Sequence, residues 1–311
     1  MSARAGPRPA PLPAGALVAP GYEVLAHLHR TGWLDLYDAW SRERECRCVV
    51  KVLRPDRDAD PELRERLLRE GRWLKDFTHP HLVRAYEVAG AADPRPYVVL
   101  ETLTGETLDH LVQYADALPD AGDLALLGVQ LCSAVHYLHG QGLLHLDIKP
   151  DNVVIDCRRA KLLDLSTAAP PGPGEPGIGT RCYLSPEQAR GGPLTAATDV
   201  WGIGVTLYEA ATATVPFDEG EEPQEETSDE PPGEDEPDED AWGEEELAAR
   251  YPQLRGRAPS VAARRRLPAG LAAAIDACLR PDPAARPPLD ALAAALDALL
   301  PQGRRTAAPR E

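Results

Sequence analysis

An eight-residue stretch, His145 to Asn152, constrains this chain more than any other part of it. It reads H-L-D-I-K-P-D-N. An apolar helical pattern at 124–139 precedes it and a short apolar run at 153–155 follows it. This context predicts a polar loop between a helix and a strand.

The residue types in this loop suit the transfer of a phosphoryl group. An Asp such as Asp147 can accept a proton from an attacking hydroxyl, and a Lys two residues later, Lys149, can neutralise charge on the phosphoryl group. Asn152 offers an amide oxygen to a magnesium ion, and Asp164, which follows the next apolar pair, offers a carboxylate. A polar loop with chance spacing would look the same, so the rest of the chain must supply further parts.

Composition sets the broad class. The chain has 311 residues, 43% of them hydrophobic, enough for one two-lobed domain or two small ones. It has no run of 18 uninterrupted apolar residues, so we expect no membrane span. Residues 1–21 are rich in Pro and Ala and lack the apolar core of a signal peptide, which predicts a disordered tail. The six Cys are scattered, which favours reduced thiols and a cytoplasmic protein.

The net charge of −17 comes from one segment. Residues 218–246 hold 17 acidic side chains and no Lys or Arg, and the remaining 33 acidic residues equal the 33 basic ones. No basic face dominates, which argues against a nucleic-acid partner. The segment itself is predicted to be a disordered insertion. It is either a solvated loop or a docking or autoinhibitory arm.

The apolar periodicity divides the chain into two parts. Alternating and apolar runs predict several strands before residue 104, with one amphipathic helix at 61–77 among them. Helical patterns dominate from Leu108 onward, so we place a boundary near Thr104. The predicted class is α+β, a small mainly antiparallel sheet with one helix and then a larger mainly helical part. The predicted strands are 22–28, 34–40, 46–53, 82–88 and 97–103.

Seven motifs in order resemble those of the eukaryotic-type protein kinases found in bacteria, over about residues 22–300. The resemblance implies a bilobal kinase fold with an N-lobe at 22–103, a C-lobe at 104–300 and a C-terminal tail at 301–311. The motifs are Val49-Val50-Lys51, Glu70, the loop 145–152, Asp164-Leu165-Ser166, Gly179-Thr180 with Ser185-Pro186-Glu187, Asp199–Gly204 and Arg286.

The resemblance also implies site residues, with ATP and Mg²⁺ as cofactors and a protein as substrate. Lys51 would neutralise the ATP phosphates, and Glu70 would hold its ammonium group. Asp147 and Lys149 would be catalytic, and Asn152 and Asp164 would hold the magnesium. Leu28, Leu36, Val49, Leu100 and Val154 would enclose the adenine, with Leu100 as gatekeeper, and the backbone of Glu101 and Leu103 would bind the purine edge.

Other matching residues are expected to build the fold. Asp199 would accept hydrogen bonds from backbone N–H groups of the catalytic loop. Glu187 and Arg286 would form a buried bidentate ion pair that fixes the activation segment.

Three departures from the family pattern bear on activity. The loop over the phosphates has His29, Thr31 and Leu34 where the family has glycine, which predicts a weaker or stiffer cradle although N–H groups remain. Leu146 stands where many kinases have an Arg that binds a phosphate on the activation segment. Ser166 replaces the glycine of the metal motif, and 168–177 contains no hydroxyl residue.

We therefore expect a serine/threonine protein kinase. Lys149 and Thr180 favour a Ser/Thr over a Tyr acceptor, since the Thr180 hydroxyl can bond to Asp147 and Lys149. A pseudokinase that binds nucleotide or acts as a scaffold is the first alternative, because the glycine loop is degraded. A small-molecule phosphotransferase is the second, and the peptide-binding motifs at 185–187 and 199–204 argue against it.

Overall fold

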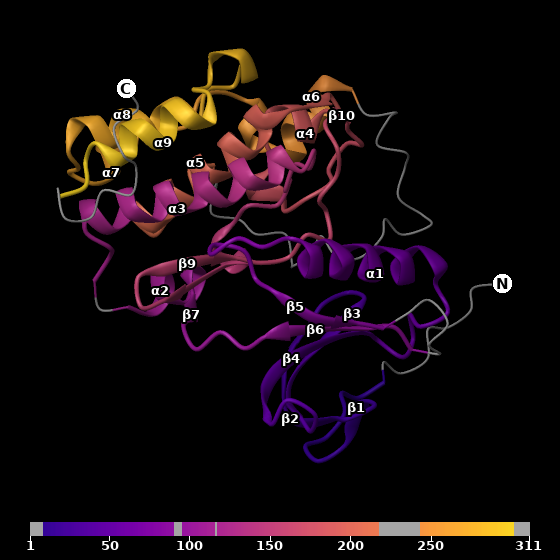
Figure 1. The fold of residues 1–311 in the computed structure, drawn as a ribbon. Helices are drawn as coiled ribbons and strands as arrows, with labels where there is room; N and C mark the ends of the chain where they lie inside the picture. Colours follow the sequence, from indigo (N-terminus) through magenta and orange to yellow (C-terminus); the bar gives the residue numbers. More distant parts are fainter. Residues whose placement is uncertain (1–8, 90–94, 116, 218–242, 302–311) are drawn as a thin grey trace. The chain divides into compact units, whose positions relative to one another are not determined.

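The structure, a computed structural model, describes residues 9–89, 95–115, 117–217 and 243–301 (Figure 1). The described residues form two compact units. The first unit runs to Thr78 and resumes at Leu82–Leu103; the second contains His79–His81 and the described chain from Thr104 onward. Most of the predicted acidic insertion and the two ends of the chain lie outside the described residues.

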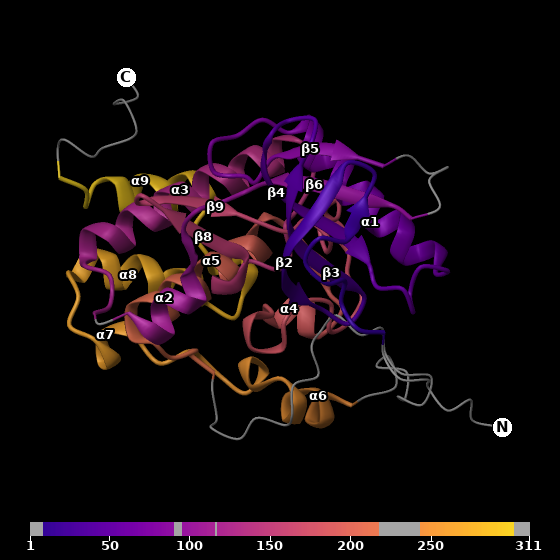
Figure 2. The ribbon, with the colours of Figure 1, turned by 90° about the horizontal axis from the view of Figure 1, so that it is seen from below.

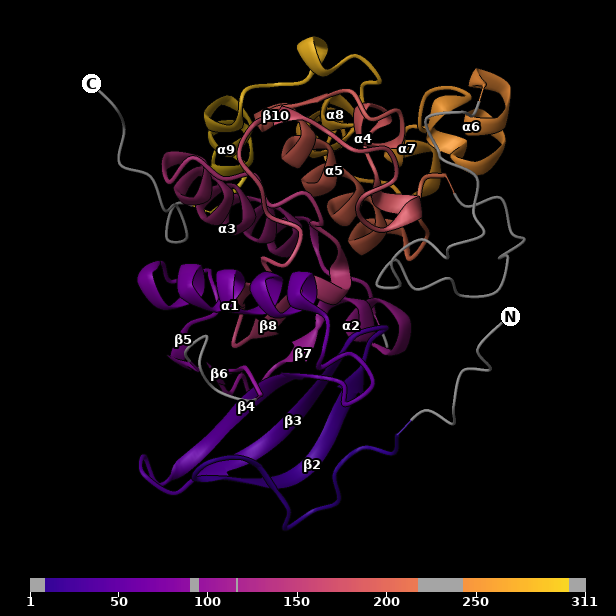
Figure 3. The same ribbon diagram turned by 90° about the vertical axis from the view of Figure 1, so that its right-hand side faces the viewer.

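The first unit is built on a six-stranded antiparallel sheet (Figure 3). Its alternating residues bury one face around Tyr22, Val24, Tyr37 and Val50, as the sequence pattern predicts. The strand order is β1-β2-β3-β4-β6-β5, with β1 Leu17–Ala19, β2 Tyr22–Arg30, β3 Leu34–Ser41, β4 Cys46–Leu53, β5 Ala85–Val88 and β6 Tyr97–Glu101.

Strand β1 corrects the predicted disordered tail. Leu17–Ala19 pairs with β2, and Val18 and Ala19 are buried in the same cluster as Tyr22. A Pro/Ala-rich composition disfavours order only where no apolar surface is buried, and here the sheet supplies a partner.

Helix α1, Pro61–Asp76, begins where the sequence places a start signal. The Asp60 side chain accepts hydrogen bonds from the N–H groups of Glu62 and Leu63, and Pro61 occupies the first turn. The buried face packs on β4, β5 and β6. At Gly71 a Cβ atom would lie 2.5 Å from a Val98 methyl group, so glycine permits the close approach of helix and sheet.

The second unit is mainly helical. Its long helices α3 and α5 pack against each other, with α8 and α9 beside them (Figures 1 and 2). The helices are α2 Leu108–Tyr114, α3 Ala121–Gly140, α4 Pro186–Ala189, α5 Ala196–Thr212, α6 Glu244–Arg250, α7 Val261–Arg264, α8 Ala269–Cys278 and α9 Leu289–Asp297. Two small sheets complete it, β7 Glu106–Thr107 with β8 Val153–Asp156 and β9 Arg159–Leu162, and β10 Gly172–Pro173 with β11 Pro193–Leu194.

The start of helix α6 differs from the prediction of a disordered insertion. Helix α6 begins at Glu244, inside the range predicted to be disordered, because three Glu residues fill its first turn and favour the positive end of the helix dipole.

Within the described residues, Ala121–Gly140 is the one helix whose length and apolar character would suffice to cross a membrane. Of that window, 61% is buried inside the unit, as in the core helix of a globular domain.

Candidate active site

The catalytic loop is held by the first turn of α5. Asp199, 1% exposed, accepts hydrogen bonds from the backbone N–H groups of His145 and Leu146, both at 2.9 Å. The ring of His139 lies 2.8 Å from the same carboxylate. Leu146 has φ of +68°, a conformation that is costly for a leucine and persists only where contacts enforce it. The predicted role of Asp199 in holding the loop is therefore observed.

Asp147 lies in a small polar cluster. The Thr180 hydroxyl donates to Asp147 Oδ1 at 2.8 Å, and Lys149 Nζ donates to Thr180 Oγ1 at 2.5 Å. Lys149 Nζ also lies 3.3 Å from Asp147 Oδ2, and the Asn152 amide donates to that oxygen at 3.0 Å. The structure thus brings together the catalytic residues expected from the sequence, and it shows the predicted bonds of Thr180. Asp147 is only half-buried, so a substrate hydroxyl can approach it.

The residues expected to hold magnesium fit a hard cation. The Asn152 side-chain nitrogen donates both to the Asp147 carboxylate and to the Asp147 carbonyl, at 2.8 Å for the latter, which directs the amide oxygen away from Asp147. Asp164 Oδ1 accepts from the N–H of Ser166 at 2.8 Å, and Asp164 has φ of +51°. Amide and carboxylate oxygens are the ligands that Mg²⁺ uses together with substrate phosphates.

In the first unit, Lys51 and Glu70 form a buried ion pair. Lys51 Nζ lies 2.9 Å from both carboxylate oxygens of Glu70, and the two residues are 3% and 1% exposed. Strand β4 supplies the lysine and α1 the glutamate. An ammonium group fixed in this way has one preferred position, which suits it to bind a phosphate.

The strand register gathers most of the expected adenine residues of the first unit on one face. Leu36 pairs with Lys51, and Val49 pairs with Leu100. Because directly opposed residues point to the same side and Val49 and Lys51 are two apart, all four share a face of the sheet. Leu28 falls where the β2–β3 register shifts, and it is 52% exposed.

Three further residues were expected to contact the adenine: Glu101 and Leu103 through their backbone, and Val154 through its side chain. The Glu101 N–H donates to the carbonyl of Arg84 at 2.9 Å, so a purine would meet the Glu101 carbonyl. Leu103 is half-buried at the end of the first unit. In the second unit, Val154 is buried on β8.

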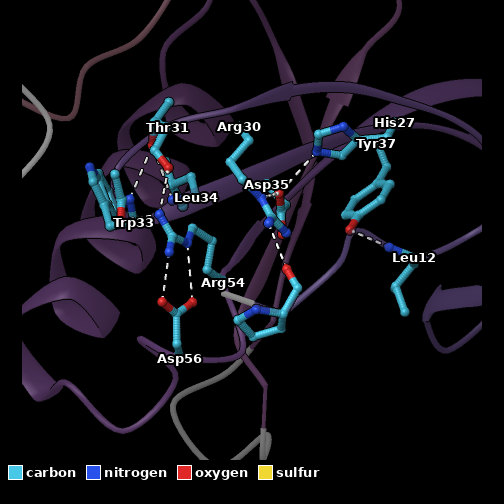
Figure 4. A network of polar contacts seen from close by, with 12 residues as sticks. Leu12, His27, Arg30, Thr31, Trp33, Leu34, Asp35, Tyr37, Arg54 and Asp56 are labelled. Carbon is cyan, nitrogen blue, oxygen red and sulfur yellow. Dashed lines mark hydrogen bonds and ion pairs between the residues drawn. The ribbon is translucent and has the colours of Figure 1, made fainter. Parts of the chain in front are cut away.

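The turn between β2 and β3, which replaces the glycine-rich loop, bonds to itself (Figure 4). The Thr31 N–H donates to the carbonyl of Leu34 at 3.0 Å. The Thr31 hydroxyl accepts from the N–H groups of Trp33 and Leu34, at 3.3 and 3.0 Å. The N–H groups expected to remain for a phosphate are therefore engaged inside the turn at these three positions.

Arg54 fixes the same turn through its backbone carbonyls (Figure 4). Its buried guanidinium donates to the carbonyls of Thr31 and Gly32 at 3.1 and 2.8 Å, and it binds Asp56 through two nitrogens at 3.1 and 2.6 Å. The Trp33 side chain is buried as well. Side-chain contacts thus support the conformation of this turn at both its N–H and its carbonyl groups.

A second network lies beside the turn (Figure 4). Arg30 binds Asp35 through two nitrogens at 2.7 and 2.8 Å, and the His27 ring lies 2.9 Å from the same carboxylate. Burial opposes the charge of Asp35, but the hydrogen bonds from Arg30 and His27 outweigh it and lower the pKa of Asp35. Arg30 also donates to the carbonyl of Pro9 at 2.6 Å, which ties the start of the described chain to the hairpin.

Two side-chain pairs, one of them only partly buried, anchor the segment that follows Thr180. Arg286 binds Glu187 through two nitrogens at 2.6 and 2.8 Å, as expected from the sequence. The Tyr183 hydroxyl donates to Glu209 at 2.7 Å. Desolvation by burial raises the pKa of Glu209 to about 7, although the bond from Tyr183 partly opposes this shift. The Tyr183–Glu209 pair was not predicted from the sequence, because neither residue belongs to the seven motifs that carry the resemblance.

The chain belongs to the protein kinase family, because the protein kinase domain matches residues 32–295. It is 35% identical to serine/threonine-protein kinase PknB of Mycobacterium leprae over 179 residues, 54% of this chain and 29% of that protein. It is 34% identical to the probable serine/threonine-protein kinase CE0033 of Corynebacterium efficiens over 220 residues, 67% and 33% of the two chains. The matches span about a third of the length of these curated relatives.

A solved structure agrees with the fold. The kinase domain of Mycobacterium tuberculosis PknI matches with a TM-score of 0.64 over 93% of this chain and 99% of that one, at 22% identity. A single-site mutant of that domain matches with a TM-score of 0.66. The predicted α+β class with a protein-kinase-like fold is confirmed, as is the resemblance to bacterial kinases of the eukaryotic type.

Proposed function

We propose that this protein is a serine/threonine protein kinase that transfers the γ-phosphate of ATP to hydroxyl groups of proteins. The observation that carries the proposal is the cluster of Asp147, Lys149 and Thr180, in which a half-buried carboxylate is oriented by a hydroxyl and lies beside an ammonium group. The cluster suits a proton acceptor placed next to a developing negative charge.

In the proposed reaction, Asp147 orients the substrate hydroxyl and takes its proton. A bond forms between the hydroxyl oxygen and the γ-phosphorus, the bond from that phosphorus to the β–γ bridging oxygen breaks, and ADP leaves with that electron pair. Lys149 offsets charge on the phosphoryl group in transfer. Lys51, fixed by Glu70, holds the phosphates that remain on ADP.

A bound Mg²⁺ would neutralise the triphosphate charge, with Asn152 and Asp164 as its protein ligands. The residues proposed to contact the adenine are Leu28, Leu36, Val49, Leu100 and Val154, with the backbone of Glu101 and Leu103. We propose a cytoplasmic location, which the six scattered Cys residues favour because reduced thiols are typical of that compartment.

A pseudokinase is the second candidate, and the self-bonded turn at residues 29–34 favours it. Its engaged N–H groups weaken one contact that kinases make with ATP, while the Lys51–Glu70 pair and the Asp147 cluster are features of a working transferase. The two candidates differ in turnover.

The deciding experiment measures transfer of radiolabelled γ-phosphate from ATP with Mg²⁺ to generic protein substrates by purified protein. We expect transfer to Ser and Thr, and a decrease of roughly 10²- to 10⁴-fold for Asp147→Asn, which keeps the size and one acceptor oxygen but cannot take the proton. A wild-type protein that transfers no more phosphate than Asp147→Asn would establish the pseudokinase.

A further inference from the structure

A buried glutamine joins the catalytic loop to the activation segment. Gln188 lies on α4 and is 4% exposed. Its side-chain nitrogen donates to the carbonyl of Leu146 at 2.8 Å and to the carbonyl of Ile178 at 3.3 Å. Its side-chain oxygen accepts from the N–H of Ser185 at 3.1 Å, which closes the capping box of α4.

The amide of Gln188 has only one workable orientation. A side-chain amide has two N–H donors and one oxygen, and both donors here meet carbonyl oxygens. The reversed orientation would place the amide oxygen against those two carbonyls and a nitrogen against the Ser185 N–H. The donor role toward Leu146 therefore follows from the surroundings.

The hydrogen bond from Gln188 is the second of two that hold the backbone of the strained residue Leu146. Leu146 directly precedes Asp147, and its N–H is held by Asp199 at 2.9 Å while its carbonyl is held by Gln188. Both sides of a residue with φ of +68° are thus fixed by buried side chains. At Gly179, φ is +123° and a Cβ atom would lie 3.2 Å from the Leu146 carbonyl, so little other space remains around that oxygen.

The hydrogen bonds that join the catalytic loop to the activation segment through Gln188 involve no charged group. Position 146 is a buried leucine, so its side chain carries no charge to bind a phosphate on the activation segment. Gln188 instead holds Leu146 and Ile178 together through uncharged hydrogen bonds that are present without any modification.

We propose that Gln188 is a positioning residue for the phosphotransfer reaction. It acts through the Leu146 carbonyl to fix the backbone from which Asp147 projects, and it couples that backbone to the activation segment. The inference rests on the proposed function, because its main readout is turnover.

The test is Gln188→Glu, which keeps the shape and the acceptor for the Ser185 N–H but turns the donor into a carboxylate oxygen. We expect kcat to fall by roughly 10- to 100-fold at pH 7.5, since displacement of a catalytic group by about 1 Å has an effect of this size. The KM for ATP should stay within about twofold, because the hydrogen bonds of Gln188 go to Leu146, Ile178 and Ser185, none of which is proposed to contact ATP.

The pH profile separates positioning from packing. Two carbonyl oxygens beside the carboxyl group introduced at position 188 would raise its pKa, and its protonated form can donate one hydrogen bond to Leu146. The activity of Gln188→Glu relative to wild type should therefore recover as the pH is lowered from about 8 to about 6. A merely structural defect would lower the melting temperature but leave the kcat of the folded protein at the wild-type value at every pH, and that result would contradict the proposal.

Gln130→Glu is the matched control. Gln130 is also buried, and it donates to the carbonyl of Arg158 at 3.1 Å and accepts from the N–H of Ala160 at 2.5 Å, so it bonds α3 to the β8–β9 turn and to β9 itself. The same substitution there should lower the melting temperature without a pH-dependent loss of kcat. If Gln188→Glu does not fold, Gln188→Met, which keeps the length and loses both donors, is compared with Gln130→Met.

Hydrogen exchange of the peptide 143–152 gives a readout without turnover. Faster exchange of its amides in the Gln188 variants than in the Gln130 variants is expected, since the Leu146 peptide loses one of its two supports. If wild type has no transferase activity, the proposed function fails and exchange alone decides the positioning role. A kcat within twofold of an active wild type, or unchanged exchange when the wild type is inactive, would overturn the inference.

Discussion

At the scale of single residues, the buried ion pair of Lys51 and Glu70 allows a loss of phosphate transfer to be measured separately from a loss of folding stability. Lys51→Met should abolish detectable transfer because the phosphate contact is lost. It should also destabilise the protein by about 3–5 kcal/mol, because the Glu70 carboxylate is left buried without its ammonium partner.

The control is the double variant Lys51→Met/Glu70→Gln. It removes the charge that was left without a partner, so the free energy of unfolding should recover by more than half while transfer stays absent. Denaturant unfolding and the radiolabel assay measure the two quantities. A double variant that regains activity would show that Lys51 does not contact the nucleotide.

Glu209 provides a pH-dependent test at the same scale. Its pKa is raised from 4.5 to about 7, so the folded protein keeps it protonated while the unfolded chain ionises between these values. The unfolding free energy therefore decreases as the pH rises from about 4.5 to 7, by roughly 3 kcal/mol for a shift of this size.

Glu209→Gln imitates the protonated form and still accepts the bond from Tyr183. Its unfolding free energy should exceed that of wild type at about pH 8 and equal it near pH 4.5, as measured by urea unfolding at both values. An equal difference at the two pH values would mean that Glu209 does not titrate in this range.

At the scale of the elements, the β2–β3 turn is the part whose sequence departs furthest from the family pattern. Thr31→Val keeps the shape of the side chain but removes the oxygen that accepts from Trp33 and Leu34. The N–H groups of Trp33 and Leu34 can then donate hydrogen bonds to a phosphate of ATP. We expect ATP to bind about tenfold more tightly, which corresponds to about 1.4 kcal/mol.

Fluorescence titration with a labelled ATP analogue measures this affinity. Replacing His29, Thr31 and Leu34 together by glycine should tighten binding or raise turnover as well. An unchanged affinity in both variants would mean that the N–H groups of this turn are not what limits binding.

The elements also show how far the sequence could predict the structure. The alternation in 22–28, the apolar run in 46–53 and the helical spacing in 61–77 predicted these strands and α1 correctly, because local pattern and burial agree there. The predictions of disorder at β1 and at the start of α6 were wrong because they used composition alone. Composition shows neither the pairing of β1 with β2 nor the favourable place of three Glu residues in the first turn of a helix.

In the site, too, the residues that could be predicted are those whose grouping is visible in the sequence itself. Asp147, Lys149 and Asn152 could be predicted to act together because one short loop carries all three. Arg54 and Gln188 were missed, since their main partners are backbone carbonyls and a carbonyl is present at every position of the sequence.

At the scale of the whole molecule, the activation segment is anchored along its length without any charge at position 146. Leu144 and Ala169 form a bridge, β10 pairs with β11, and Thr180 bonds to Asp147. The segment from 168 to 177 has no hydroxyl group to receive a phosphate. We therefore expect full activity without phosphorylation of the activation segment.

Protein expressed in bacteria would be treated with phosphatase, repurified and assayed beside an untreated sample, with phosphorylation sites mapped by mass spectrometry. Equal activity is expected. A large loss of activity, together with a phosphate mapped at Ser166, Thr167 or Thr180 in the untreated sample, would contradict this expectation.

The side-chain contacts that order the β2–β3 turn have a thermodynamic consequence for nucleotide binding. A glycine-rich loop loses conformational entropy when it closes on a ligand, whereas a turn held by Thr31 and Arg54 has already lost it during folding. Binding here instead breaks internal hydrogen bonds, so the unfavourable contribution of the loop is enthalpic. Calorimetric titration should find a smaller entropic penalty for ATP than in kinases with three glycines, and a less favourable heat of binding.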